Sequence, residues 1–309
     1  MICPESNVVS IPLDAIQCDN NYFKISKPLS RELVRSVLHY GIIEPVLLIK
    51  WQEQYVPVCG HNRIIAAQQA GIKDVPAKIV TELSMDDFLQ IVRVKLYNNA
   101  LGTIGKIKSL YLLYDYFNAD KKKVMAIAQE LSLPASLPEF KNIRSIIELP
   151  PVIIQYIDSR SISPKFVMPI LRLPQSSIAL LEKITSACQL RVNYFNSMVV
   201  MIEDIYRMGK DKLLGDSIEF LLTKETILDD DIHNCIYSIR YPQYTEYMVR
   251  INEIKKKLNA CGIKVDIPAY LEGDSINVIF EVKKNKPLHP LLKKDQDILG
   301  LIELLIGLL

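Results

Sequence analysis

The chain has 309 residues, enough for two or three domains of ordinary size, each with its own core. Its 37 lysines and arginines nearly balance 35 aspartates and glutamates, and the formal net charge is only +2. No global positive field therefore indicates nucleic-acid binding, so any DNA-binding surface must be a local patch.

The cysteines predict neither a metal centre nor a disulfide framework. Six are present, widely spaced and without a CxxC pair: Cys3, Cys18, Cys59, Cys188, Cys235 and Cys261. This pattern argues against a zinc ribbon and is typical of a reducing compartment. We expect no metal site among them.

We expect a cytoplasmic protein that makes no membrane contact. The first residues, MICPESNVVSIPL, lack a basic region followed by a long apolar core, and no uncharged apolar run reaches 18 residues. The apolar tail DILGLIELLIGLL is short and contains Glu303. It reads as a packing or dimerisation helix rather than a membrane contact.

Up to about residue 80, short strand-like runs alternate with helical ones. The run VVSIPLDAI is strand-like, and PLSRELVRSVLHYG predicts a helix with Ser30 as N-cap and Gly41 as its stop. The run PVLLIKWQEQYVPVC predicts a β-hairpin with a polar turn at Gln52–Gln54. A helix over Ile64–Ala70, closed by a glycine, and a strand in VPAKIV complete a small mixed α/β domain.

The rest of the chain reads as helical at first and mixed at its end. Between about residues 84 and 185, runs such as MDDFLQIVRVKLYN and IGKIKSLYLLYDYF are helical and are punctuated by prolines. Farther on, IKVDIPAYLEGDSINVIFEVKK predicts two strands about a turn at Gly273–Asp274. We therefore predict an α+β protein with an all-helical middle, and domains at residues 1–83, 84–188 and 189–309.

The four residues Gly60, His61, Asn62 and Arg63 lie between a strand and a helix. Unpaired amides and the helix dipole favour an anion there. The glycine allows close approach, the arginine can hold a phosphate bidentately, and the histidine and asparagine can add hydrogen bonds. The alternative is an ordinary helix start, capped by Asn62, with Arg63 paired to Glu44 or Glu82.

The ordered series IPLDAI, GIIEPVLLI and YVPVCGHNRIIAAQQAGIKDVPAKIV resembles the N-terminal domain of the ParB family of partition proteins, within a superfamily that includes sulfiredoxin. The resemblance implies a switch that binds CTP, or another nucleoside triphosphate with Mg²⁺, through Gly60, His61, Asn62 and Arg63. Sulfiredoxin has a nucleophilic cysteine just after the glycine of this box, whereas Cys59 precedes it here. We expect Cys59 to be inert.

In the family, a second box rich in asparagine, with an arginine a few residues on, completes the pocket. The matching segment here is KLYNNALGTIGKIK, in which Asn98 and Asn99 stand at the start of the box. The arginine is missing, and Lys106 is the nearest cation. We therefore expect nucleotide binding rather than turnover, with at most a weak CTPase. The alternative role for Asn98 and Asn99 is helix-end capping.

The segment from Lys121 to Leu171 resembles the helix-turn-helix region of ParB, with helices at Val124–Leu131 and Glu139–Ile147. The N-terminal residues of the second helix of such a motif read base edges. The candidate DNA-binding residues are therefore three lysines for phosphates and three readers of bases: Lys121, Lys122, Lys123, Lys141, Asn142 and Arg144. The turn SLPASLPEF is longer than a tight turn. A helical bundle with a solvated charged face is the alternative.

Together these patterns predict a nucleoid-associated, ParB-like DNA-binding protein that acts in chromosome or plasmid partition or a related DNA-organising role. A homodimer is expected, with a partition ATPase as a further partner. The enzymatic alternative is a phosphotransferase with Glu44 or Asp74 as base and Mg²⁺ on the phosphates. The third alternative is an interaction protein whose pocket has decayed, as the missing arginine suggests.

Overall fold

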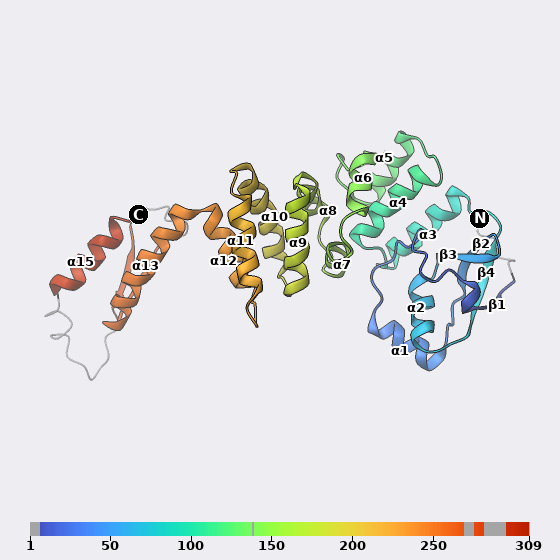
Figure 1. Cartoon of the computed structure of the whole chain (residues 1–309), viewed down its shortest axis with the longest axis horizontal. Helices are drawn as coiled ribbons and strands as arrows, with labels where there is room; N and C mark the ends of the chain where they lie inside the picture. Colours follow the sequence, from blue (N-terminus) through green and yellow to red (C-terminus); the bar gives the residue numbers. More distant parts are fainter. Residues whose placement is uncertain (1–6, 138, 269–274, 281–294, 309) are drawn as a thin grey trace.

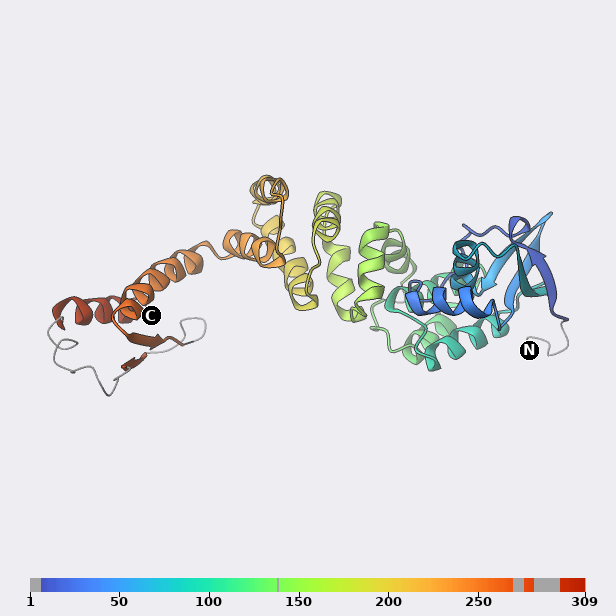
Figure 2. The ribbon, with the colours of Figure 1, turned by 90° about the horizontal axis from the view of Figure 1, so that it is seen from below.

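The computed structural model describes residues 7–137, 139–268, 275–280 and 295–308. The chain is elongated, with a four-stranded sheet at one end, a row of helices in the middle, and a two-stranded sheet with two helices at the other end (Figures 1 and 2). The mixed α+β class with a helical middle, expected from the sequence, is confirmed.

The elements follow in chain order. The first part contains β1 Val9–Pro12, η1 Leu13–Ala15, α1 Arg31–Tyr40, β2 Val46–Trp51, β3 Gln54–Cys59, α2 His61–Gln69 and β4 Asp74–Val80. The helical part contains α3 Met85–Tyr97, α4 Thr103–Asp115, α5 Lys121–Glu130, α6 Phe140–Ile147, α7 Pro151–Ser159, α8 Pro164–Val167, η2 Met168–Arg172, α9 Gln175–Ala187, α10 Val192–Arg207, α11 Asp211–Leu222 and α12 Asp229–Arg240. The last part contains α13 Pro242–Ala260, β5 Ile263–Asp266, β6 Asn277–Phe280 and α15 Asp295–Ile306.

The first sheet has the strand order β1-β4-β2-β3 and is covered on both faces. Only β2 and β4 run parallel; the other neighbours are antiparallel. Side chains alternate along β2, so Val46 and Leu48 pack with α2 on one face, whereas Leu47 and Ile49 face the core formed with α3. This double burial explains why the strand is an unbroken apolar run.

The two local predictions in this domain are confirmed. The hydroxyl of Ser30 accepts a hydrogen bond from the Leu33 amide at 3.2 Å and caps α1, and Gly41, at φ 70°, ends the helix. Strands β2 and β3 form the predicted hairpin, with Gln52 at φ 56° in its turn.

One hydrophobic core runs through the helices from α3 to α12. It includes the large buried side chains Phe88 and Phe195, and it continues without a break past residue 188. A separate small core joins α13, β5 and α15. The predicted domain limits at 83 and 188 stay predictions; the packing places the next change of core between α12 and α13.

The predicted strand pair near the C-terminus is confirmed: β5 and β6 are antiparallel, with Ile263 opposite Phe280. The turn expected at Gly273–Asp274 lies outside the described residues. The apolar tail forms helix α15, and its Ile298 and Leu305 are buried against α13 and β5. Its role in dimerisation stays a prediction.

The described cysteines, which exclude Cys3, are free and partly buried. Among the described helices, none combines the length and the apolar character needed to span a bilayer.

Candidate functional site

Gly60 sets the direction in which α2 leaves the sheet. It is the helix N-cap, in the left-handed region at φ 101°, and a Cβ there would lie 2.7 Å from Cγ1 of Val46 on β2. The first intrahelical bond runs from the Ile64 amide to the Gly60 carbonyl at 3.0 Å. The helix therefore begins at His61, and the predicted start at Ile64 and the alternative of an Asn62 cap are wrong.

Because α2 begins at His61, the amides of its first turn are the ones left without an intrahelical acceptor. They adjoin a cavity of about 270 Å³. The cavity is lined by the loop before α1, the start of α2 and the end of α3: Ser26, Lys27, Pro28, Ser30, Leu33, Glu44, Gly60, Asn62, Arg63, Lys95 and Ala100. Three of these side chains are cationic and one is acidic, so the cavity favours an anion.

Arg63 is held at the cavity wall by the segment that precedes β2. Its Nη1 donates to the carbonyl oxygens of Glu44 and, at 3.2 Å, of Pro45, and it lies 3.4 Å from the Glu44 carboxylate. The Arg63 side chain is 20% exposed and that of Glu44 is 85% exposed. The pairing with Glu44 is thus present, and the guanidinium has further N–H donors for a ligand.

Lys27 connects the two predicted boxes. Its carbonyl accepts from Nδ2 of Asn62 at 2.9 Å, and its ammonium group donates to Oδ1 of Asn99 at 3.0 Å. Its amide bonds the Ala100 carbonyl at 3.0 Å. Oδ1 of Asn62 is buried and has no hydrogen-bond partner, so an acceptor at the cavity is left for a ligand donor or a water molecule.

His61 does not line this cavity. It is 3% exposed, and its Nε2 has no hydrogen-bond partner. Burial, together with the nearby ammonium groups of Lys24, Lys95 and Lys108, lowers the pKa of His61 to about 3. The ring is therefore neutral near pH 7 and contributes no positive charge to an anion site.

The second box reaches the cavity through Ala100 rather than through its asparagines. Asn98 is the C-cap of α3 and Asn99 has φ 51°; both are exposed, and neither lines the cavity. Asn99 contributes indirectly, through its bond to Lys27. Lys106 on α4 is partly buried, and burial followed by the charge of Lys27 lowers its pKa.

Helix α4 begins in the segment that lacks the arginine expected after Asn98 and Asn99, and a side chain from another helix caps its N-terminus. Oδ1 of Asp158, on α7, accepts the Ile104 amide at 2.8 Å and so caps the N-terminus of α4. Burial raises the pKa of Asp158 to about 6, although this hydrogen bond and the charge of Lys27 oppose the rise.

Asp158→Asn is expected to stabilise the chain at alkaline pH. The folded-state pKa of Asp158 lies above its ordinary 3.8, so the folded chain binds this proton more tightly, and its contribution to stability falls as pH rises from about 4 through 6. Asparagine keeps the acceptor for Ile104 without the charge. Urea unfolding at pH 8 should show a gain of up to about 3 kcal/mol over the wild type, vanishing near pH 4.

The control for this substitution is Asp158→Ala, which removes the acceptor as well as the charge. It should be less stable than the asparagine variant at every pH, by about 1–2 kcal/mol. An asparagine variant that loses stability at pH 8 would contradict the burial of a charged carboxylate at this helix end.

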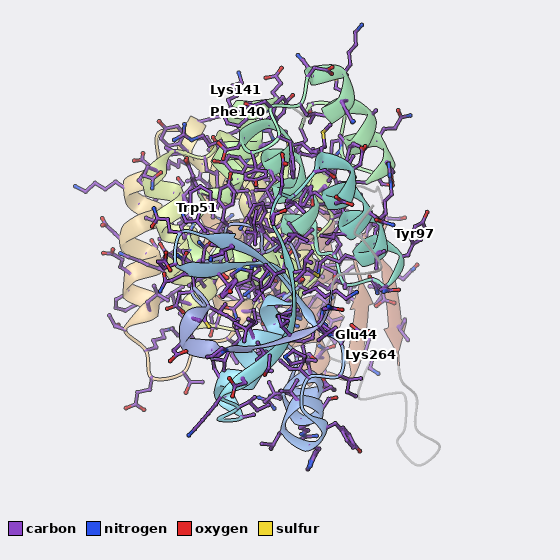
Figure 3. The ribbon with its side chains drawn as sticks, turned by 90° about the vertical axis from the view of Figure 1, so that its right-hand side faces the viewer. Glu44, Trp51, Tyr97, Phe140, Lys141 and Lys264 are labelled. Carbon is purple, nitrogen blue, oxygen red and sulfur yellow. The ribbon has the colours of Figure 1, made fainter. Side chains whose placement is uncertain are left out.

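The predicted helix-turn-helix residues lie on α5 and α6. Helix α5 begins at Lys121, earlier than predicted, and α6 spans Phe140–Ile147 with Glu139 as its N-cap. Residues 131–139 separate the two helices, so the long turn expected from the sequence is present. Figure 3 shows Phe140 and Lys141 in the upper part of the view and Glu44 in the lower part, so the start of α6 lies apart from Glu44.

Several candidate DNA readers already have partners within the chain. Arg144 Nε lies 2.7 Å from Oε1 of Glu148, one turn along α6, and Nδ2 of Asn142 donates to the Ser136 carbonyl at 3.0 Å. The ammonium group of Lys141 lies 3.7 Å from Glu139. Lys141, Arg144 and Glu148 are exposed on one side of α6, so this surface carries both signs of charge.

Lys121 and Lys122 are exposed in the first turn of α5, and Lys123 is 3.9 Å from Asp86. Three lysines at a helix N-terminus oppose the helix dipole, so helix stability does not explain them.

Sequence reasoning missed the lysines around the α2 cavity and Asp158. Lys27 and Lys95 line the cavity, and Asp158 caps α4, but each comes from a segment far along the chain. No spacing rule links these positions. Across the residues that the structure describes, no group of three His, Cys, Asp or Glu side chains could hold a metal ion.

Residues 3–99 match the family model of the ParB N-terminal domain. A curated chromosome-partitioning protein ParB of Myxococcus xanthus is 28% identical over 139 residues, which are 43% of this chain and 46% of that protein. The "Probable plasmid-partitioning protein ParB" of Thermus thermophilus is 29% identical over 105 residues, 32% of this chain and 35% of that protein. The resemblance drawn from the sequence is confirmed, and the chain spans less than half the length of these relatives.

Two solved structures of C-terminally truncated chromosome-partitioning protein ParB from Caulobacter crescentus also match. One is complexed with CTP-gamma-S. It is 22% identical, with a TM-score of 0.25, and the match covers 58% of this chain and 99% of that chain. The other is complexed with the centromeric parS site, at 22% identity and TM-score 0.26, over 62% of this chain and 97% of that chain.

Proposed function

We propose that the chain is a ParB-like DNA-binding protein of chromosome or plasmid partition, with a nucleotide switch in its N-terminal domain. The match of residues 3–99 to the ParB N-terminal domain and the similarity to ParB partition proteins support this proposal. One observation carries the proposal. The first turn of α2, Arg63, Lys27 and Lys95 converge on a single cavity beside the second box.

The ligand that fits this convergence is a nucleoside triphosphate, with CTP as the first candidate. Its phosphates bear several negative charges in one row, which match the free amides at the start of α2 and the three cationic side chains. The cavity of about 270 Å³ is small for a whole nucleotide. It holds the phosphates, and the rest of the nucleotide extends beyond it.

The acidic side chains support binding better than turnover. Glu44 is the one carboxylate among the described residues that line the cavity, and its side chain is 85% exposed and lies 3.4 Å from the Arg63 guanidinium. Asp74, the other candidate base, opens β4 opposite Pro12 and does not line the cavity. A Mg²⁺ ion would therefore be held by phosphate oxygens and water, with Glu44 as its protein ligand.

The proposed DNA surface consists of α5 and α6. Lys121, Lys122 and Lys123 supply phosphate contacts, and Lys141, Asn142 and Arg144 face the bases once their internal pairs are exchanged for DNA. The proposed assembly is a homodimer in the cytoplasm that is bound to the nucleoid and interacts with a partition ATPase. Nucleotide binding would shift the dimer between open and closed states around DNA.

The double variant Lys121→Ala/Lys122→Ala is expected to weaken DNA binding for every sequence alike. Phosphate contacts carry no base information, so affinity should fall and the slope of log affinity against log salt should shrink by about 2. Fluorescence anisotropy with specific and scrambled duplexes, at several salt concentrations, measures both quantities. A matched control is Lys255→Ala/Lys256→Ala on α13, which should change neither.

A thermal-shift titration with CTP, ATP and GTP, each with and without DNA, tests the proposed function. A ligand that binds only the folded chain raises its apparent melting temperature, by an amount that grows with concentration. One nucleotide, in the presence of Mg²⁺, should raise it well above the other two. A flat response to all three would leave the decayed-pocket alternative as the better account.

A further inference from the structure

A larger cavity, of about 870 Å³, lies on the other side of the segment that precedes α1. The Asn21–Leu29 segment forms one wall, and α4, α7 and the end of α6 form the other. Ser26 and Pro28 line both this cavity and the one beside α2. Its volume is in the range that holds small molecules.

Two lysines line this cavity without an acidic partner. Lys24 and Lys108 are partly buried, and within the described residues neither forms an ion pair. The ammonium group of Lys108 donates to the Asn21 carbonyl at 2.5 Å. Tyr22, which also lines the cavity, donates its hydroxyl to the Asp115 carboxylate at 2.6 Å.

The arrangement of these lysines is costly in the absence of a ligand. Burial lowers the pKa of Lys24, and burial with the charge of Lys24 lowers that of Lys108 to about 8. The two ammonium groups repel each other and are partly desolvated. A doubly negative group bound between them would offset both costs.

The rest of the cavity wall is mostly apolar. Ile25, Leu29, Ile104, Ile147, Leu149 and Ile154 contribute to it. Asp158 also lines the cavity; its Oδ1 is used by the Ile104 amide, which leaves Oδ2 for a ligand donor. A ligand that fills this space therefore combines a dianion with an apolar body.

We propose that this cavity binds a small phosphate monoester with an apolar or aromatic body, whose phosphate lies between Lys24 and Lys108. The site is separate from the nucleotide site proposed beside α2, because Arg63 and the start of α2 do not line it. The apolar body packs against Ile104 and Ile154, and the cavity links the N-terminal domain to α4 and α7.

Calorimetric titration of the full chain with phenyl phosphate tests the proposal. Saturable binding is expected, at least tenfold tighter than that of inorganic phosphate, because only the ester has an apolar body. Lys24→Met and Lys108→Met should each weaken binding at least tenfold. Lys212→Met, a lysine exposed on α11, and Arg63→Ala should leave it unchanged.

Stability measurements distinguish a binding role from a structural one. If Lys108 serves a ligand, Lys108→Met should unfold at the same or a higher temperature than the wild type, because a partly buried cation without an acidic partner is removed. Lys24→Met repeats the binding test in the loop if the Lys108 variant fails to fold. No saturable binding by the wild type, or binding lost in Arg63→Ala and kept in both lysine variants, would overturn the proposal.

Discussion

Gly105→Ala is expected to destabilise the chain by about 3 kcal/mol or more. A Cβ at Gly105, in the first turns of α4, would lie 1.9 Å from the carbonyl oxygen of Ile25 and 3.0 Å from its carbonyl carbon. Both atoms belong to backbone that is held in place by the bridge between Ser26 and Leu101. The added methyl group must therefore push α4 away from the loop that lines both cavities.

Gly215→Ala is the matched control, since Gly215 also lies inside a helix, α11, and nothing lies within 4 Å of a Cβ built there. Alanine should stabilise that helix by about 0.5–1 kcal/mol. Urea unfolding of the two variants measures the contrast. Equal and small effects at both positions would contradict the close approach of α4 to Ile25.

Arg63→Ala is expected to weaken nucleotide binding by about 100-fold or more. Arg63 is the one arginine among the described residues that line the cavity beside α2, and loss of its charge-assisted hydrogen bonds to phosphate costs about 1.5–3 kcal/mol even before the charge itself is counted. Isothermal titration with the nucleotide selected by thermal shift measures the change.

The substitution also removes the bonds from Arg63 to the carbonyls of Glu44 and Pro45, at a cost of about 1–3 kcal/mol in stability. The chain should still fold, because Gly60, Ile64 and the sheet hold α2 without it. Far-UV circular dichroism checks this. Arg35→Ala, on the exposed side of α1, is the control and should bind nucleotide as the wild type does.

The elements with strong local signals could be predicted from the sequence. Helix α1 has a hydroxyl cap at Ser30 and a glycine stop at Gly41, and the β2–β3 hairpin has two apolar runs about a polar turn. The ordered motifs of residues 8–80 indicated the family that the comparison over residues 3–99 supports. In each case, the signal that predicts the element lies in residues close together in the sequence.

The features that depend on distant contacts could not be predicted. The sequence predicts that α2 starts at Ile64, three residues after its observed start at His61. The left-handed φ of Gly60 follows from its close approach to Val46 on another strand, which the local sequence does not show. The partners of Asn142 and Arg144 depend on how the long turn and α6 pack.

The charged groups that act on His61 and on the start of α4 could not be predicted from the sequence either. Lys24, Lys95 and Lys108 lie far apart along the chain, yet together they act on the buried ring of His61. Asp158 stands 54 residues after the amide that it caps. Such groups acquire their roles only when the N-terminal domain packs on α4 and α7.

Calorimetric titration of the full chain with CTP and Mg²⁺, repeated on Arg63→Ala, tests the central claim most directly. We expect one saturable site per chain in the wild type and binding at least about 100-fold weaker in the folded variant. An absence of saturable binding of CTP, ATP or GTP to the wild type, or equal affinity for the two proteins, would contradict a nucleotide site at the start of α2.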